Sequence, residues 1–136
     1  MKKIFLTLLL VFPLIGYANK LATYESILNA IKKGKEISLH LDFAKCSPSV
    51  NVNASHFVHS IFFNDKNIIF SDVHFTRNNP KFLEQSVFEY IAYNLDKDTS
   101  NLQIKVSILD PINYEQKSEP MIRNCKFNQG AFFFST

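Results

Sequence analysis

Histidine and aspartate recur at the same two-residue spacing in two parts of the chain. The first pair is His40 and Asp42, and the second pair is Asp72 and His74. Residues two apart on a strand point to the same face, so two neighbouring strands would bring all four side chains together. Imidazole and carboxylate groups suit zinc and related divalent metals. The spacing raises the hypothesis of a metal-binding protein or a metal-dependent hydrolase, against the alternative of ordinary polar residues on the wet face of a sheet.

Patterns for other kinds of catalysis are weaker. Ser38, His40 and Asp42 are the residue types of a hydrolase triad, but on one strand they cannot form the relay, and the sequence has no Gly-x-Ser-x-Gly motif. Glu84 and Glu89 would face opposite sides of a strand, which does not favour a glycosidase pair. The sequence therefore predicts no catalytic residues and no cofactor, and it favours a protein without enzymatic activity.

The amino terminus indicates export. Lys2 and Lys3 precede the apolar run 4–15, and Gly16 and Ala18 place small residues before a cleavage point. The run is too short for a transmembrane helix, which needs about 20 apolar residues. We expect residues 1–18 to be a cleaved secretory signal and residues 19–136 to form a single domain without a membrane span.

Export changes the meaning of the two cysteines, Cys46 and Cys125. In an oxidising compartment two cysteines allow one intramolecular disulfide. The bond would close a loop of about 80 residues, to which chain-entropy arguments assign roughly 4 kcal/mol of stability. A reactive or metal-binding thiol pair is the alternative, although the spacing is not that of a Cys-x-x-Cys motif. We expect the bond to clamp the first strand to the last one.

The charge balance does not favour a polyanionic partner. Removing Lys2 and Lys3 from the 15 basic residues leaves 13, against 12 acidic residues. This near-neutral balance provides no basic surplus for nucleic acid or for an anionic membrane. We therefore expect no nucleic-acid partner.

Residues 19–33 have the spacing of a short amphipathic helix. The apolar stripe recurs every three or four residues and consists of Leu21, Tyr24, Ile27, Leu28 and Ile31. Thr23 is a candidate N-cap, but Ser26 is a weak partner for completing a capping box. Gly34 would end the helix, because glycine adopts positive φ without strain.

The rest of the chain has the pattern of strands. Apolar and polar residues alternate over 36–43, and 87–95 favours a strand over a helix because it is aromatic and β-branched. Gly130 suggests a bulge or a close backbone approach. Turn signals separate two expected hairpins and a last strand, which are 56–63 with 68–77, 87–95 with 102–109, and 125–135. The order predicts an α+β fold with an N-terminal helix packed on a mostly antiparallel, curved sheet of about six strands, held by one disulfide.

Aromatic residues are unusually frequent, with 14 Phe and 5 Tyr but no Trp. The consecutive phenylalanines 132–134 require at least one ring to point outward unless both faces of the strand are covered. A Phe-rich core is one interpretation. An apolar pocket or a partner surface is the other, and it predicts a protein partner or a small apolar ligand.

The order of four segments carries a family resemblance. The segments are AIKKGK (30–35), ISLHLDFAKC (37–46), FSDVHFT (70–76), and a terminal cysteine that leads into GAFFF (130–134). This order resembles the VirK family of small exported bacterial proteins. The resemblance implies a periplasmic or secreted protein of host-associated bacteria that is linked to virulence and has no established enzymatic activity. It also implies that Cys46 and Cys125 are structural.

These features together predict an exported, virulence-associated protein that binds a protein partner or a small apolar ligand and has no catalytic role. The alternative is a metal-binding protein or metal-dependent hydrolase that uses His40, Asp42, Asp72 and His74.

Overall fold

The structure is a computed structural model that describes residues 18–136. The expected signal peptide, residues 1–18, therefore lies outside the described residues except for Ala18. Within the described part no helix is long and apolar enough to cross a membrane.

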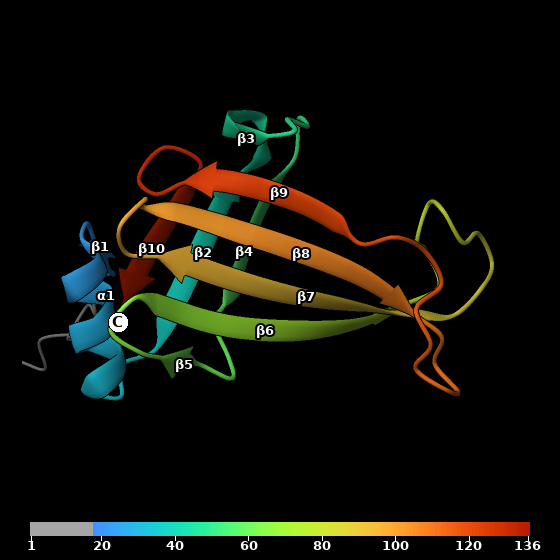
Figure 1. Ribbon diagram of the computed structural model, residues 1–136, viewed down its shortest axis with the longest axis horizontal. Helices are drawn as coiled ribbons and strands as arrows, with labels where there is room; N and C mark the ends of the chain where they lie inside the picture. The colour runs from blue at the N-terminus through green and yellow to red at the C-terminus, as the bar shows by residue number, and fades with distance from the viewer. Residues whose placement is uncertain (1–17) are drawn as a thin grey trace, which may run out of the picture.

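Two antiparallel sheets make up most of the molecule (Figure 1). The four-stranded sheet has the order β1 (Asn19–Leu21), β10 (Ala131–Ser135), β2 (Ile37–Asp42) and β4 (Asn53–Phe57). The six-stranded sheet has the order β3 (Cys46–Ser47), β9 (Met121–Lys126), β8 (Asn101–Leu109), β7 (Val87–Asp96), β6 (Asn67–Thr76) and β5 (Phe62–Phe63). A short helix, α1 (Tyr24–Lys32), and a 3-10 turn, η1 (Phe43–Lys45), complete the described elements.

The expected α+β fold, with a helix packed on one sheet of about six strands, is wrong. The chain instead forms two sheets and is mostly β, and α1 lies at one end of them (Figure 1). The chain changes sheet at places that look locally like continuous strand or simple turn. At η1 it passes from β2 to β3, and between Lys126 and Ala131 it passes from β9 to β10. Alternating polarity reports which residues face a core, but not which sheet a strand joins.

The apolar face of the first strand is confirmed by β2. Ile37, Leu39 and Leu41 are buried, and the residues between them are more exposed. β10 pairs with β2 and adds Ala131 and Phe133 to the same buried face. This face forms one wall of the core.

Phe70 of β6 lies where the two sheets meet. Its ring stacks on Tyr93 of β7 with centroids 4.5 Å apart and meets Phe133 of β10 edge-on at 6.0 Å. All three side chains are almost completely buried. Because the rings come from both sheets, a single apolar core holds the sheets together. Figure 1 shows the long strands of one sheet running across those of the other, as in a sandwich with crossed strands.

The second expected hairpin is confirmed, whereas the first is wrong in part. β7 and β8 pair in register from Asp96↔Asn101 to Phe88↔Leu109. The region expected as one strand at 56–63 is divided, because β4 pairs with β2 and the short β5 pairs with β6. Ser60 has a φ of 50° and lies in the bend that separates the two strands.

Helix α1 is shorter than expected but better capped. Thr23 Oγ1 accepts a hydrogen bond from the Ser26 backbone N–H at 3.1 Å, and Ser26 Oγ accepts one from the Thr23 N–H at 3.1 Å. The expectation that Ser26 is too weak for a capping box is therefore wrong. The residues before Thr23 form β1, which pairs with β10. Residues 19–21 therefore form a strand with β10, although the apolar spacing of 19–33 predicted a helix there.

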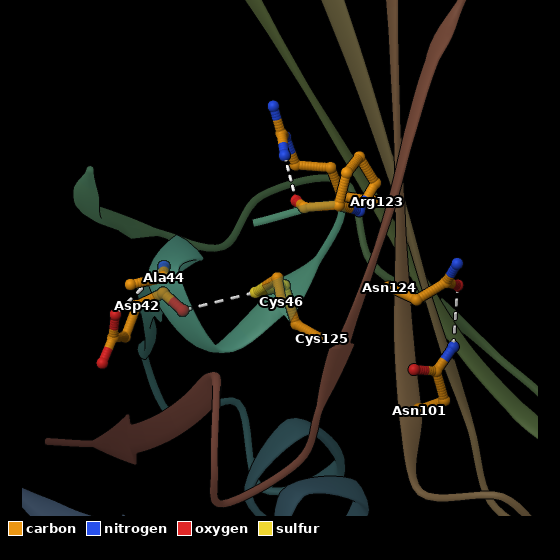
Figure 2. Close-up of a disulfide and its surroundings, with 8 residues drawn as sticks. Asp42, Ala44, Cys46, Asn101, Arg123, Asn124 and Cys125 are labelled. Carbon is orange, nitrogen blue, oxygen red and sulfur yellow. Dashed lines mark hydrogen bonds between the residues drawn. A yellow bond between two sulfur atoms is a disulfide. The ribbon is translucent and has the colours of Figure 1, made fainter. Parts of the chain in front are cut away.

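The disulfide between Cys46 and Cys125 is present and closes a sequence separation of 79 residues. Its expected place is wrong, because Cys46 lies in β3 and Cys125 in β9, which pair with each other in the six-stranded sheet. The bond does not join the first long strand to the last one. Figure 2 shows it beside η1, with the Asp42 carbonyl oxygen 3.4 Å from Cys46 Sγ. Asn101 and Asn124, on neighbouring β8 and β9, share a hydrogen bond of 3.0 Å in the same view.

Candidate functional site

The four residues of the metal hypothesis do not come together. His40 and Asp42 lie on β2 of the four-stranded sheet, whereas Asp72 and His74 lie on β6 of the six-stranded sheet. His40 alternates with the buried Leu39 and Leu41, so it faces away from the core that separates the sheets. Among residues 18–136 no group of three or more His, Cys, Asp or Glu side chains is arranged to hold a metal ion.

Asp42 stabilises the local turn. Its Oδ1 accepts a hydrogen bond from the Ala44 N–H at 3.2 Å, and its Oδ2 lies 2.9 Å from Lys45 Nζ (Figure 2 shows the contact with Ala44). The hydrogen bond from Lys45, with smaller help from Ala44, lowers the pKa of the Asp42 carboxyl below its ordinary value. The His40 ring instead lies 4.9 Å from the ring of Phe134. The contacts of Asp42 therefore stabilise the local turn, and His40 packs against an aromatic ring.

Asp72 and His74 also have structural partners. His74 Nδ1 lies 3.2 Å from Glu89 Oε2, and Asn79 Nδ2 donates to Glu89 Oε1 at 2.8 Å. Asp72 Oδ1 accepts from the Val73 backbone N–H at 2.8 Å. These contacts order the end of the sheet and provide no set of ligands converging on one point.

The half-buried His56 lies beside the buried Tyr93 at the edge of the core. Their rings lie 5.3 Å apart. Burial lowers the pKa of His56, with Asp72 acting in the opposite direction. Burial, assisted by Asp72, raises the pKa of the Tyr93 phenol. Both shifts favour the uncharged form, so this pair behaves as core packing near neutral pH.

The outer side of the six-stranded sheet carries the most distinctive surface. Val73 lies opposite Tyr90, Phe75 lies opposite Phe88, and Phe88 lies opposite Leu109. These positions alternate with the buried ones of the same strands, so their side chains share the face that points away from the core. We call this surface the outer aromatic face, and it consists of Val73, Phe75, Phe88, Tyr90, Leu109 and Tyr114.

Aromatic contacts organise the outer aromatic face. Phe88 meets Phe75 edge-on at 5.3 Å and stacks on Tyr114 at 5.8 Å. Tyr114 comes from the loop after β8, where its backbone N–H donates to the Asp110 carbonyl oxygen at 3.0 Å. Asp110 Oδ1 accepts from the Ile112 N–H at 2.9 Å, and this bond is the main cause of the lowered pKa of Asp110. The turn built on Asp110 therefore holds Tyr114 against the sheet.

A hollow of about 350 Å³ lies in the outer aromatic face. Its described lining consists of Val73, Phe88, Tyr90, Leu109 and Tyr114, all apolar or aromatic. Val73 of the lining is 55% exposed, and Phe75, which meets Phe88 edge-on, is 54% exposed. Large apolar side chains clustered in this way on a surface are typical of binding sites. The hollow can accept apolar groups, and its phenols can add hydrogen bonds at the rim.

The sequence hypothesis of an aromatic surface rested on residues 132–134, and Phe132 and Phe134 do alternate with the buried positions of β10. Phe132 and Phe134 on β10 are only half-buried, but Lys20 Nζ lies 5.0 Å from the Phe132 ring centre and His40 covers Phe134. A clearer indication of a second apolar face was present in β7, which has apolar residues at both even and odd positions. Phe88 and Tyr90 alternate with the core-facing residues, and this made 87–95 ambiguous between strand and helix instead of indicating a second apolar face.

Comparisons with known proteins give one consistent result. Residues 20–114 match the family model described as VirK protein. The chain is also similar in structure to the crystal structure of lpg1832, a VirK family protein from Legionella pneumophila, with a TM-score of 0.79 and 29% sequence identity. The similarity covers 86% of this chain and 99% of that one. No curated protein matches this chain.

Proposed function

This chain belongs to the VirK family, and on that premise we propose that it is exported and binds a protein partner through the outer aromatic face, without catalysing a reaction. Family membership suggests a virulence-associated role. Together with the disulfide, it also suggests a location outside the cytoplasm. The periplasm or the extracellular medium of a bacterium is the location we propose.

The observation that carries the binding proposal is the outer aromatic face. Five apolar or aromatic side chains gather there on paired strands and Tyr114 joins them from a loop, and the lining of the hollow includes no carboxylate, imidazole, thiol or amine from the described residues. Removing apolar surface from water contributes about 25 cal/mol of favourable free energy per Å² of that surface. The two phenols of Tyr90 and Tyr114 are the only ionisable groups among the described lining residues, so the lining supports binding more than acid–base or nucleophilic chemistry.

A protein partner fits this surface better than a small ligand. Small-molecule sites bury about 70–90% of the ligand, but Val73 of the lining and the neighbouring Phe75 are more than half exposed. A broad, open aromatic surface instead suits the apolar side chains of another protein, for which Tyr and Phe are frequent anchors. A small apolar ligand remains an outcome that the experiment distinguishes.

The binding proposal is tested with matched phenylalanine variants. Phe75→Ser and Tyr90→Ser remove parts of the outer aromatic face, and Phe57→Ser removes an equally exposed ring from β4, in the other sheet. Phe57 and Phe75 are both 54% exposed, so loss of apolar surface alone affects both variants equally. The exported chain and its variants are crosslinked in the periplasm and in the culture medium, and captured proteins are identified by mass spectrometry.

We expect a specific partner whose affinity, measured with purified proteins, falls at least about tenfold in Phe75→Ser and Tyr90→Ser but not in Phe57→Ser. Equal affinity in all variants would contradict the proposal. Displacement of an apolar dye by fatty acids from the wild type but not from Tyr90→Ser, with no protein captured, would assign the face to a small ligand.

Export is tested separately from binding. The chain is expressed in a bacterium, and the protein recovered outside the cytoplasm is sequenced from its amino terminus. We expect processing after Ala18, so that the exported chain begins at Asn19. Retention of an unprocessed chain in the cytoplasm would contradict export and would leave the binding test unaffected.

A further inference from the structure

Most of β6 has no strand on one of its sides. β7 pairs with β6 along its whole length, from Asn67 to Thr76. On the opposite side β5 pairs only with Ile68 and Ile69. Within residues 18–136 no strand pairs with 70–76 on that side, and Figure 1 shows this stretch at the outer edge of the six-stranded sheet.

The hydrogen bonds at the start of β6 show which backbone groups face the open side. The Asn67 carbonyl oxygen accepts from the Asn64 N–H at 3.0 Å, on the side of β5. The Lys66 carbonyl oxygen accepts from the Lys97 N–H at 2.9 Å, on the side of β7. Because backbone groups alternate in direction along a strand, the N–H and C=O groups of residues 71, 73 and 75 point to the open side.

Only local protection of this edge is visible among the described residues. The Val73 N–H donates to Asp72 Oδ1, the neighbouring side chain, at 2.8 Å. Native edge strands are commonly protected by Lys, Pro or inward-pointing charged residues; the segment 70–76 contains no Lys, Pro or Arg, and Asp72 is its one acidic residue on the core-facing side. An open edge of this length is a template for strand addition.

We propose that this edge pairs with the same edge of a second copy of the chain, antiparallel, about a two-fold axis at Val73. The occupant is a second copy because the edge is complementary to itself in this register. Val73 lies opposite the partner's Val73, and Ser71 lies opposite the partner's Phe75, so a small side chain meets a large one. Asp72 lies opposite the partner's His74, which places a carboxylate against an imidazole.

The adjacent registers are less favourable. A two-fold axis at Asp72 would place two carboxylates directly opposite each other, and an axis at His74 would do the same for two imidazoles. In the register centred on Val73, the odd-numbered residues form the hydrogen-bonded pairs. Asp72 and His74 then occupy non-hydrogen-bonded pairs, in which Cα atoms are only about 4.5 Å apart and side chains approach most closely.

Pairing also changes the outer aromatic face. Ser71, Val73 and Phe75 share the outer side of β6, so the faces of the two copies would become continuous across the axis. At present the Val73 N–H donates to the Asp72 carboxylate. In the dimer this N–H would donate to the partner's backbone instead, and the Asp72 carboxylate would contact the imidazole of the partner's His74. The closed two-fold arrangement uses each edge once and leads to a dimer instead of a fibre.

The experiment is sedimentation equilibrium of the exported chain with its disulfide intact, over a range of concentrations up to millimolar. Val73→Pro removes the central N–H without removing a bond to β7, because that group points away from β7. Val73→Thr is the matched control, since it keeps the N–H and a β-branched side chain. Tyr90→Ser is a second control, because it alters the outer aromatic face and leaves the edge intact.

We expect a monomer–dimer equilibrium in the wild type, in Val73→Thr and in Tyr90→Ser, and a dimer at least about tenfold weaker in Val73→Pro. Asp72→Asn, which keeps the shape of the side chain, should weaken the dimer by a smaller factor and covers the case in which Val73→Pro does not fold. Slower amide exchange at 71, 73 and 75 on raising the concentration would locate the contact. A wild type that stays monomeric, or a dimer unaffected by both Val73→Pro and Asp72→Asn, would overturn the proposal.

Discussion

Gly130 provides the space that the disulfide occupies. A Cβ atom at this position would meet Cys46 Sγ at 3.0 Å and the Lys45 carbonyl oxygen at 3.2 Å. The sulfur is tied to Cys125 and cannot turn away. The expected close approach at Gly130 is therefore confirmed. The atoms that come close are the Cys46 sulfur of the disulfide and the Lys45 carbonyl oxygen.

Substituting Gly130 should destabilise the protein. We expect Gly130→Ala to lower the free energy of unfolding by about 1–3 kcal/mol, as overpacking does elsewhere, measured by urea denaturation. Gly34→Ala is the control, because Gly34 has open space around it and a φ of +68°, so its cost comes from backbone strain of roughly 1–2 kcal/mol. Unfolding of Gly130→Ala at the wild-type midpoint would refute the steric role.

We expect His56 to make the stability depend on pH. Burial lowers the pKa of His56 in the folded protein from its ordinary 6.5, so the unfolded chain takes up the proton first. The stabilisation is fully present above the unfolded pKa and is lost as the pH falls through the folded pKa. Urea midpoints should therefore fall between about pH 7 and pH 5, and this fall should be smaller in His56→Phe.

The carboxylates provide an internal comparison for this prediction. Hydrogen bonds lower the pKa values of Asp42, Asp96 and Asp110 below their ordinary 3.8. Their contribution is present above that value and disappears only in more acidic solution. Equal slopes for wild type and His56→Phe between neutral pH and pH 5 would exclude His56 as the cause.

At the scale of elements, α1 depends on its amino-terminal cap and on tertiary packing. The helix has only nine residues, and isolated helices of this length are marginal in water. Tyr24, Ile27 and Ala30 are buried against the sheets, and the Tyr24 hydroxyl donates to the Asn64 carbonyl oxygen at 3.2 Å. The helix therefore closes one end of the sandwich and does not cover a whole sheet.

Removing the cap should have a measurable cost. We expect Thr23→Ala to reduce the free energy of unfolding by about 1 kcal/mol, because it leaves the Ser26 N–H without its acceptor. Ser26→Ala, which removes the reciprocal bond to the Thr23 N–H, should cost less. Both values come from chemical denaturation, and a Thr23→Ala variant as stable as wild type would contradict the cap's role.

At the scale of the whole molecule, the two sheets share one apolar core, and we expect them to unfold together. Phe133 contacts Phe70 and Phe127, which belong to the six-stranded sheet and the turn after it. The disulfide lies at the point where the chain enters that sheet from the other one. Loss of packing between the sheets should therefore destabilise both together.

This prediction can be tested on adjacent residues of β10. We expect Phe133→Ala to cost about 3–5 kcal/mol, the range for large buried aromatic residues, with a single unfolding transition. Phe134→Ala is the matched control, since that ring faces outward beside His40 and should cost clearly less. Two separate transitions in Phe133→Ala, or equal costs for both variants, would contradict a shared core.

The sequence alone determined the features that depend on local pattern or on covalent chemistry. These are the alternation of β2, the hairpin of β7 and β8, the single disulfide, the tight approach at Gly130, and the resemblance that family comparison bears out. The alternation and the hairpin are set by residues a few positions apart, the disulfide by the pairing of two cysteines, the close approach by the residue type at 130, and the resemblance by the order of segments along the chain.

Only the tertiary structure decided how the strands divide between two sheets, and therefore which polar and aromatic residues meet. His40 and Asp42 were separated from Asp72 and His74 because β2 and β6 joined different sheets. Phe75, Phe88 and Tyr90 came together because β6 and β7 are neighbours in register, with their core-facing residues turned the other way. Period-two alternation specifies a face for each strand, but the partner strand is chosen by contacts far apart in the chain.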